Sequence, residues 1–138
     1  MSDIGRGFRT RSISLTAITT LTSTRIYPEV LPQNATLPAI TYRTITAHAE
    51  SHLLGISGLV HTRMQVDCFA ETHIAARAVH EQVRLNWVGH TGAAGSETVR
   101  GIIEDSHFSS YQVPLDGSDQ GRYVHTIDLL ISHTEATS

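Results

Sequence analysis

Histidine and acidic residues gather at positions 48–52, which read His-Ala-Glu-Ser-His. Alternate residues of a strand share a face, so His48, Glu50 and His52 could converge on one metal ion, with His61 nearby. The segment lies toward the exposed end of a predicted hairpin, where nothing fixes the ligands or excludes water. Two interpretations follow: a metal- or ligand-binding α+β domain, and polar residues on a solvated ribbon. The second is favoured, and no metal or other cofactor is expected.

Nucleophilic and phosphate-binding chemistry find no support elsewhere in the chain. All ten basic residues are arginine, so neither a lysine Schiff base nor a Walker-type loop is available. No Gly-x-Ser-x-Gly elbow presents a serine. The single cysteine, Cys68, shares the apolar face of a predicted strand with Met64, Val66 and Ala70, which favours an inert core thiol. The sequence therefore predicts a protein that is not an enzyme.

Length and composition are typical of one globular domain in a reducing compartment. The 138 residues are 40% hydrophobic, carry a formal net charge of −3 and include one cysteine, which excludes an internal disulfide. The sequence shows no signal peptide and no apolar run long enough for a membrane helix, so no membrane partner is expected. The negative net charge argues against a nucleic-acid-binding module. The only support for such a module is the group of N-terminal arginines, Arg6, Arg9 and Arg11. We predict a flexible Arg-rich arm at 1–11, one domain at 12–133 and a polar tail at 134–138.

The elements predicted from hydrophobic periodicity give an α+β fold. A short helix is expected at 13–23, and Pro28 and Pro32 exclude a central strand between it and Pro38. A long strand begins at Pro38, turns at Gly55, Ser57 and Gly58, and returns with Met64 to Ala70 alternating between two faces. Two more long strands are expected at 99–113 and 123–132. The prediction is a mainly antiparallel sheet of about four strands with one long helix on one face.

The long helix follows Thr72, a residue suited to capping a helix N-terminus. Its apolar residues fill an arc wider than one sheet face requires, which indicates a helix that is either deeply packed or covered on a second side by another subunit. The polar stripe opposite this arc holds Arg77, His80, Glu81 and Arg84.

The hairpin tip carries the large aliphatic residues Leu53, Leu54 and Ile56, which a solvated turn would rarely hold. Either these side chains contact a partner or the tip folds back on its own domain. We take Leu53, Leu54, Ile56, Arg77 and Arg84 as the candidate subunit or partner interface.

Taken in order, the segments resemble the tail-completion, or tail-terminator, proteins of long-tailed bacteriophages and related particles. RIYPEVLPQ and LPAITYRTIT resemble the family's entry to its first long strand. The return strand resembles the family's Arg-x-Gln-Val/Ile-Asp pattern through Arg63, Gln65, Val66 and Asp67. HIAARAVHEQVRLNW and RYVHTIDLLISH resemble its helix and closing strand. The likeness spans residues 25–133 and departs from the family in the Thr-rich first helix and the Arg-rich N-terminus.

The resemblance implies a structural virion protein, assembled in the host cytoplasm and located in the tail or neck. Such proteins form a ring, typically a hexamer, at the head-proximal end of the tail tube. The ring terminates tube polymerisation and joins the tail to the head connector. The implied partners are other copies of the chain, the major tail tube protein and a connector or stopper protein, while DNA passes through the lumen without specific binding. The alternatives are another neck or head-completion subunit and the metal- or ligand-binding domain using His48, Glu50 and His52.

Overall fold

The computed structural model describes residues 4–32, 35–52, 55–95, 97–112 and 122–134. Its strands, in chain order, are β1 (Ile26–Pro28), β2 (Ala39–His52), β3 (Gly55–Ala70), β4 (Gly92–Ala94), β5 (Glu97–Gln112) and β6 (Arg122–Thr134). Its helices are α1 (Ile4–Ser14), α2 (Thr16–Thr22) and α3 (His73–Trp87). None of these helices is both long enough and apolar enough to cross a membrane.

The six described strands form one sheet in the order β1-β2-β3-β6-β5-β4. Every neighbouring pair is antiparallel except β1 and β2, which are parallel. The prediction of a mainly antiparallel α+β fold is confirmed, but its four strands are corrected to six. The two additional strands have three residues each and lie at the edges, where β1 ends at Pro28. A proline is tolerated at an edge because its missing N–H leaves no central ladder bond unmade.

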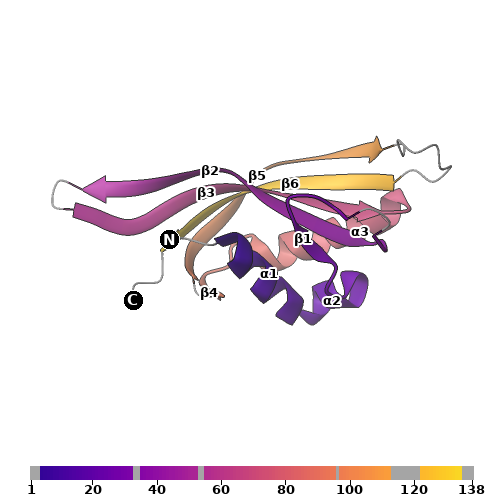
Figure 1. The fold of residues 1–138 in the computed structure, drawn as a ribbon, viewed down its shortest axis with the longest axis horizontal. Coiled ribbons are helices and arrows are strands. Elements are labelled where there is room, and N and C mark those ends of the chain that lie inside the picture. The colour runs from indigo at the N-terminus through magenta and orange to yellow at the C-terminus, as the bar shows by residue number, and fades with distance from the viewer. Residues whose placement is uncertain (1–3, 33–34, 53–54, 96, 113–121, 135–138) are drawn as a thin grey trace.

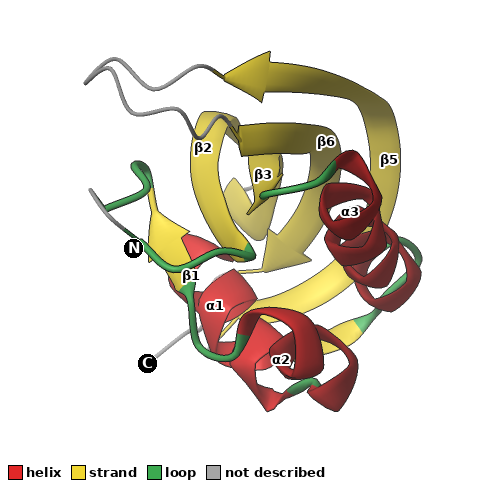
Figure 2. Cartoon of the chain, turned by 90° about the vertical axis from the view of Figure 1, so that its right-hand side faces the viewer, coloured by secondary structure: helices red, strands yellow, loops and turns green. Residues whose placement is uncertain are grey.

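All three helices lie on one side of the curled sheet (Figures 1 and 2). On the other side, Phe69 and Val124 form a small buried cluster with Leu31 and Ala39, and the rest of that side, called the open face below, carries none of the described helices. The helix-facing side carries Met64, Val66 and Cys68 of β3 beside Ile127 and Leu129 of β6, all buried. This alternation is the one expected from the sequence. At one end the β2–β3 hairpin extends beyond the helices as a two-stranded ribbon (Figure 1).

Helix α3 begins as predicted, because the Thr72 hydroxyl accepts a hydrogen bond from the backbone N–H of Ala75 at 3.1 Å. Its buried residues are Ala76, Val79, His80, Val83 and Trp87. The assignment of His80 to the polar stripe was wrong: the side chain faces the sheet and the residue is 2% exposed. The sheet covers one side of the apolar arc and leaves the other side exposed.

The N-terminal segment is helical from Ile4, which corrects the expected flexible arm. The short helix expected at 13–23 is present as α2 over Thr16–Thr22, and residues 13 and 14 belong to α1. Phe8 is fully buried and packs on Trp87, with ring centroids 4.8 Å apart. The arginines expected on the arm also make structural contacts. Arg9 donates to the backbone oxygen of Ile26 at 3.0 Å, and Arg11 donates to that of Asn86 at 2.8 Å.

The predicted β2–β3 hairpin is present, but its turn lies elsewhere. Gly55 pairs with His52 across the hairpin, so residues 55–58 belong to β3 instead of the turn. Residues 53–54, which connect the two strands, lie outside the described part of the chain.

Candidate assembly surface and histidine cluster

Three of the five predicted interface residues fall at the hairpin tip. Leu53 and Leu54 lie outside the described residues, and Ile56 is described only as a backbone position in β3. The other two lie on α3, where Arg77 is exposed and Arg84 is partly exposed. Arg84 pairs with Glu81 at 3.1 Å, and this ion pair raises the pKa of Arg84 and lowers that of Glu81.

The solvent-facing side of α3 carries an apolar stripe of Ile74, Ala78 and Leu85. Ile74 is 82% exposed and Leu85 is 61% exposed, while Ala78 between them is exposed as well. At about 100° per residue these three positions fall within one narrow sector of the helix. Arg77, Glu81 and Arg84 lie along the same side. This stripe is the uncovered part of the apolar arc of α3, which is wider than one sheet face requires.

The open face of the sheet holds a polar network built on the Arg-x-Gln-Val-Asp strand. Arg63 donates to the Asp105 carboxylate on β5 and lies 3.9 Å from Asp128 on β6. Thr126 on β6 donates to Asp67 at 2.6 Å. Gln65, between Arg63 and Asp67 on this face, donates to Asp67 at 3.3 Å. These contacts join three strands, and they give the residues that carry the sequence resemblance a structural role.

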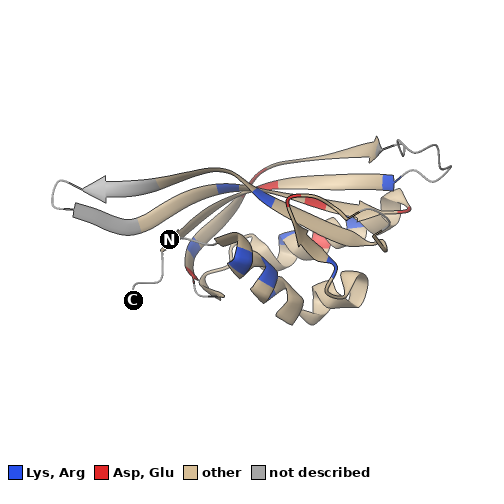
Figure 3. Ribbon diagram, in the orientation of Figure 1, with Lys and Arg blue, Asp and Glu red and all other residues tan. Residues whose placement is uncertain are grey.

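Two large apolar side chains interrupt this polar face. Ile103 and Phe108 of β5 pair with Leu130 and Thr126 of β6, which places them on the open side. They are 62% and 52% exposed. Figure 3 shows basic and acidic positions interspersed over the middle of the sheet and the helices. The described surface therefore combines mixed charge with exposed apolar positions on α3 and β5.

The histidines of the predicted hairpin cluster are only partly described. His48 of β2 lies opposite His61 of β3 in the ladder, so their side chains leave the same face. The Nδ1 atom of His61 lies 2.9 Å from the Ser132 hydroxyl. The side chains of Glu50 and His52 lie outside the described part of the chain. The pairing of His48 with His61 agrees with the expected proximity of the two residues.

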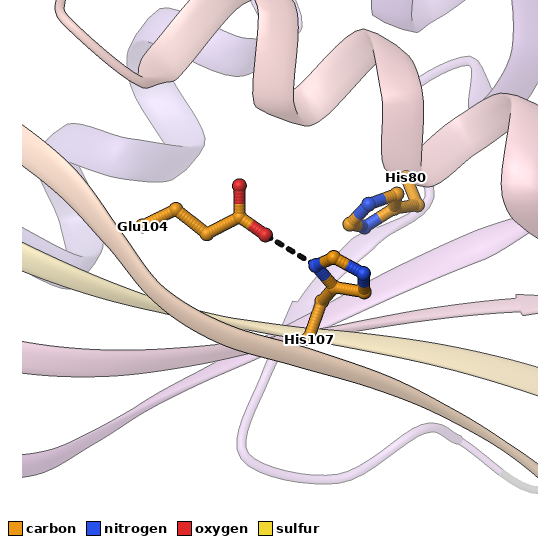
Figure 4. A group of neighbouring side chains, drawn as sticks. All are labelled: His80, Glu104 and His107. Carbon is orange, nitrogen blue, oxygen red and sulfur yellow. Dashed lines mark hydrogen bonds and ion pairs between the residues drawn. The ribbon is translucent and has the colours of Figure 1, made fainter.

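A second group of histidines, which the sequence analysis did not identify, lies between α3 and the sheet. His80 of α3 faces His107 of β5 and His125 of β6, with ring centroids at 5.4 Å and 4.0 Å respectively. Glu104 of β5 completes the group, since its Oε1 lies 2.5 Å from His107 Nδ1. Figure 4 shows His80 coming from the helix and the other two drawn residues from the strand beneath it. These four residues are called the histidine cluster below.

The charge state of the histidine cluster follows from its surroundings. Burial, and then repulsion from His125, lower the pKa of His80 to about 4. Burial, and then repulsion from His107, also lower the pKa of His125. Both rings are thus neutral at pH 7. Hydrophobic periodicity in the sequence could not predict that residues 80, 104, 107 and 125 lie together, because they come from three separate elements.

Cys68 is fully buried on the helix-facing side of β3. Burial raises the pKa of its thiol, and the neighbouring Asp67 carboxylate adds to this shift. A thiol held protonated in the core is a poor nucleophile, as the sequence analysis expected.

Comparisons with known proteins agree with the resemblance. The family model described as "Tail completion protein gp17" matches residues 9–101, about two thirds of the chain. A chain in the solved structure of the virion of a native gene transfer agent particle has the same fold, with a TM-score of 0.59 and 13% sequence identity. The match covers 91% of this chain and 89% of that one. No sequence among the curated proteins matches. By the extent of the family match, this chain belongs to the tail-completion protein gp17 family, a family of structural virion proteins.

Proposed function

We propose that the protein forms a ring of six subunits at the head-proximal end of a tail tube. The ring ends tube polymerisation and joins the tail to the head connector. The observation that carries this proposal is the family match over residues 9–101. The exposed apolar positions of α3 and β5 support it, because they provide the contact surface that a ring requires.

The stripe formed by Ile74, Ala78 and Leu85 is the proposed contact between neighbouring subunits. In a closed ring each subunit uses two different surfaces, one on each neighbour. Covering two large aliphatic side chains would contribute about 1.5–3 kcal/mol each at every contact. Arg77 and Arg84 border this stripe and keep their assignment as interface residues, with charges suited to orienting the neighbour.

The two ends of the elongated sheet suit contacts outside the ring. The β2–β3 ribbon extends away from the helices (Figure 1). Leu53, Leu54 and Ile56, at the hairpin connection in the sequence, are proposed to contact either the tail tube protein or the connector protein. DNA would pass through the lumen without specific binding, because binding to phosphates requires clustered basic groups. Among the arginines of α1, Arg9 and Arg11 are already bonded to backbone oxygens.

Sedimentation of the purified chain tests the ring. The expected result is a species of several subunits that dissociates in the Ile74→Gln, Leu85→Gln double variant. Glutamine retains helix propensity and adds no charge, so a loss of assembly would report on the apolar contact. Val30→Gln is the matched control, because Val30 is 74% exposed and lies outside α3. A ring that persists in the double variant, with circular dichroism unchanged, would contradict the proposed contact.

Another neck or head-completion subunit is the second candidate, since the open sheet face would also suit a connector partner. Tail length separates the two candidates. If the chain is a terminator, particles without it should have tubes of irregular length; if it is a connector subunit, they should have normal tubes that fail to join heads.

A further inference from the structure

The histidine cluster has the composition of a transition-metal site. One donor atom from each of His80, Glu104 and His107 lies within 4.8 Å of the other two. Within the part of the chain that the structure describes, this is the one group of three or more such residues close enough to share an ion. Two imidazoles and one carboxylate that leave a position open form a recurrent zinc ligand set.

Unpaired nitrogen atoms in the cluster point to a ligand. The Nδ1 atom of His80 and both ring nitrogens of His125 are buried and have no hydrogen-bond partner in the described structure. Buried polar atoms normally have partners, so three orphaned nitrogens in adjacent rings require an explanation. A divalent cation would accept lone pairs from such atoms.

The neighbourhood of His80 provides a means of orienting the ring. Its Nε2 atom lies 3.8 Å from the Glu81 carboxylate. A proton on Nε2, directed toward Glu81, would leave the unpaired Nδ1 atom as the ligand. Metal-bound histidines commonly donate the N–H of their second ring nitrogen to a carboxylate, and closing the 3.8 Å gap between His80 and Glu81 would make such a hydrogen bond. Glu81 also pairs with Arg84, which fixes the position of its carboxylate.

The distances fit a metal after small side-chain movements. In a tetrahedral zinc site with bonds of about 2.0–2.2 Å, ligand atoms are about 3.4 Å apart. The distance between His107 Nδ1 and Glu104 Oε1, now 2.5 Å, must increase to this value. The largest distance among the three donor atoms, which is at most 4.8 Å, must decrease to it. The side chain of His107 is 56% exposed and that of Glu104 is 23% exposed, so both have room to move and the ion has a route from solvent.

We propose that His80, His107 and Glu104 bind one zinc-class divalent cation between α3 and β5, and that the fourth position faces solvent. The ion would tie the helix to the outer part of the sheet and would replace the hydrogen bond between His107 and Glu104. It would not participate in the proposed ring contact, because Ile74 and Leu85 face the opposite side of α3.

Zinc titration of the untagged, chelator-treated full chain tests this proposal. Calorimetry and metal analysis after gel filtration are expected to give one zinc per chain, and zinc is expected to raise the melting temperature. His107→Asn and Glu104→Gln are each expected to weaken binding about tenfold or more. His48→Asn is the matched control, an exposed histidine on the β2–β3 ribbon, and is expected to bind as the unmodified chain does. The proposal would be overturned if the unmodified chain bound no stoichiometric zinc. It would also be overturned if the His107→Asn and Glu104→Gln variants bound zinc as tightly as the unmodified chain does.

A measurement on the unmodified chain gives an answer that does not depend on how the variants fold. Zinc is expected to shift the imidazole 15N resonances of His80 and His107 and to leave those of His48 and His61 in place. Shifts confined to His48 and His61 would place the ion on the hairpin and refute the site between α3 and β5.

Discussion

The indole N–H of Trp87 on α3 donates a hydrogen bond to the Ser12 hydroxyl on α1, across 3.0 Å in the buried core. Seventy-five residues separate the two partners. Phe8 stacks on the same indole, and the Arg11 guanidinium lies over it at 4.5 Å from the ring centroid. The N-terminal segment is therefore held in place by the C-terminal end of α3.

Replacing Ser12 with alanine should leave the buried Trp87 N–H without a partner. We expect the free energy of unfolding to fall by about 1–3 kcal/mol, the cost of a buried donor left unpaired. Chemical denaturation followed by tryptophan fluorescence measures this effect, because Trp87 is the single tryptophan. Ser14→Ala, at an exposed position of the same helix, should change stability by no more than about 0.5 kcal/mol. Equal effects of the two variants would contradict this role of Ser12.

Gly7 allows α1 to approach β4 closely. A Cβ atom at this position would lie 2.3 Å from the carbonyl oxygen of Ala94, which is backbone and cannot rotate away. Gly7→Ala should therefore destabilise the protein by about 1–3 kcal/mol, as overpacking does, although alanine favours helix. Gly101→Ala is the control, because a Cβ there meets nothing within 4 Å. A stabilised Gly7→Ala variant in thermal unfolding would refute the close approach.

The stability of the metal-free protein should fall as the pH decreases from 8 to 5. The pKa of His80 is about 4 in the fold and about 6.5 in the unfolded chain, so the unfolded state binds more protons between these values. The groups that face His80 are His125 of β6, His107 and Glu104 of β5, and Glu81 of α3. The His80 contribution at pH 5 amounts to no more than about 2 kcal/mol.

Urea denaturation at pH 8 and pH 5, with a chelator present, measures this dependence. Comparison with His80→Gln isolates the contribution of His80 from those of the other titrating groups. The pH slope should be smaller in the His80→Gln variant than in the unmodified chain. Identical slopes in the two proteins would show that His80 is not held neutral by the fold.

The hairpin tip yields a separate prediction for assembly. Leu54→Asp or Ile56→Asp should leave circular dichroism unchanged and impair ring formation or docking, because a charge would enter an apolar contact. Light scattering and electron microscopy of particles measure the two outcomes. Ile45→Asp, at a partly exposed position nearer the body of the same ribbon, is the matched control. Normal assembly and normal tail length in both tip variants would remove the tip from the interface.

Regular periodicity explains which elements the sequence predicts. Helix α3 combines a Thr72 cap with an amphipathic pattern, and apolar and polar residues alternate over residues 64–68 of β3 and 126–129 of β6. Strand β5 reads as mixed because register shifts at Val99/Gly101 and Glu104/Ser106 interrupt its alternation.

Tertiary contacts explain what the sequence does not predict. Helix α1 contains Gly5 and Gly7, both poor helix formers, and its position depends on Phe8, Ser12 and the distant Trp87. The break between α1 and α2 falls at Leu15, whose backbone is extended with φ of −94°. The histidine cluster likewise depends on the packing of α3 over β5 and β6, which no local pattern encodes.

Tail length in particles assembled without this chain tests the central claim most directly. If the ring terminates the tail tube, electron micrographs of a deletion mutant should show tubes of irregular length, detached from DNA-filled heads. Supplying the chain in trans should restore tubes of uniform length joined to heads. Tubes of normal, uniform length attached to heads in the deletion mutant would contradict the account.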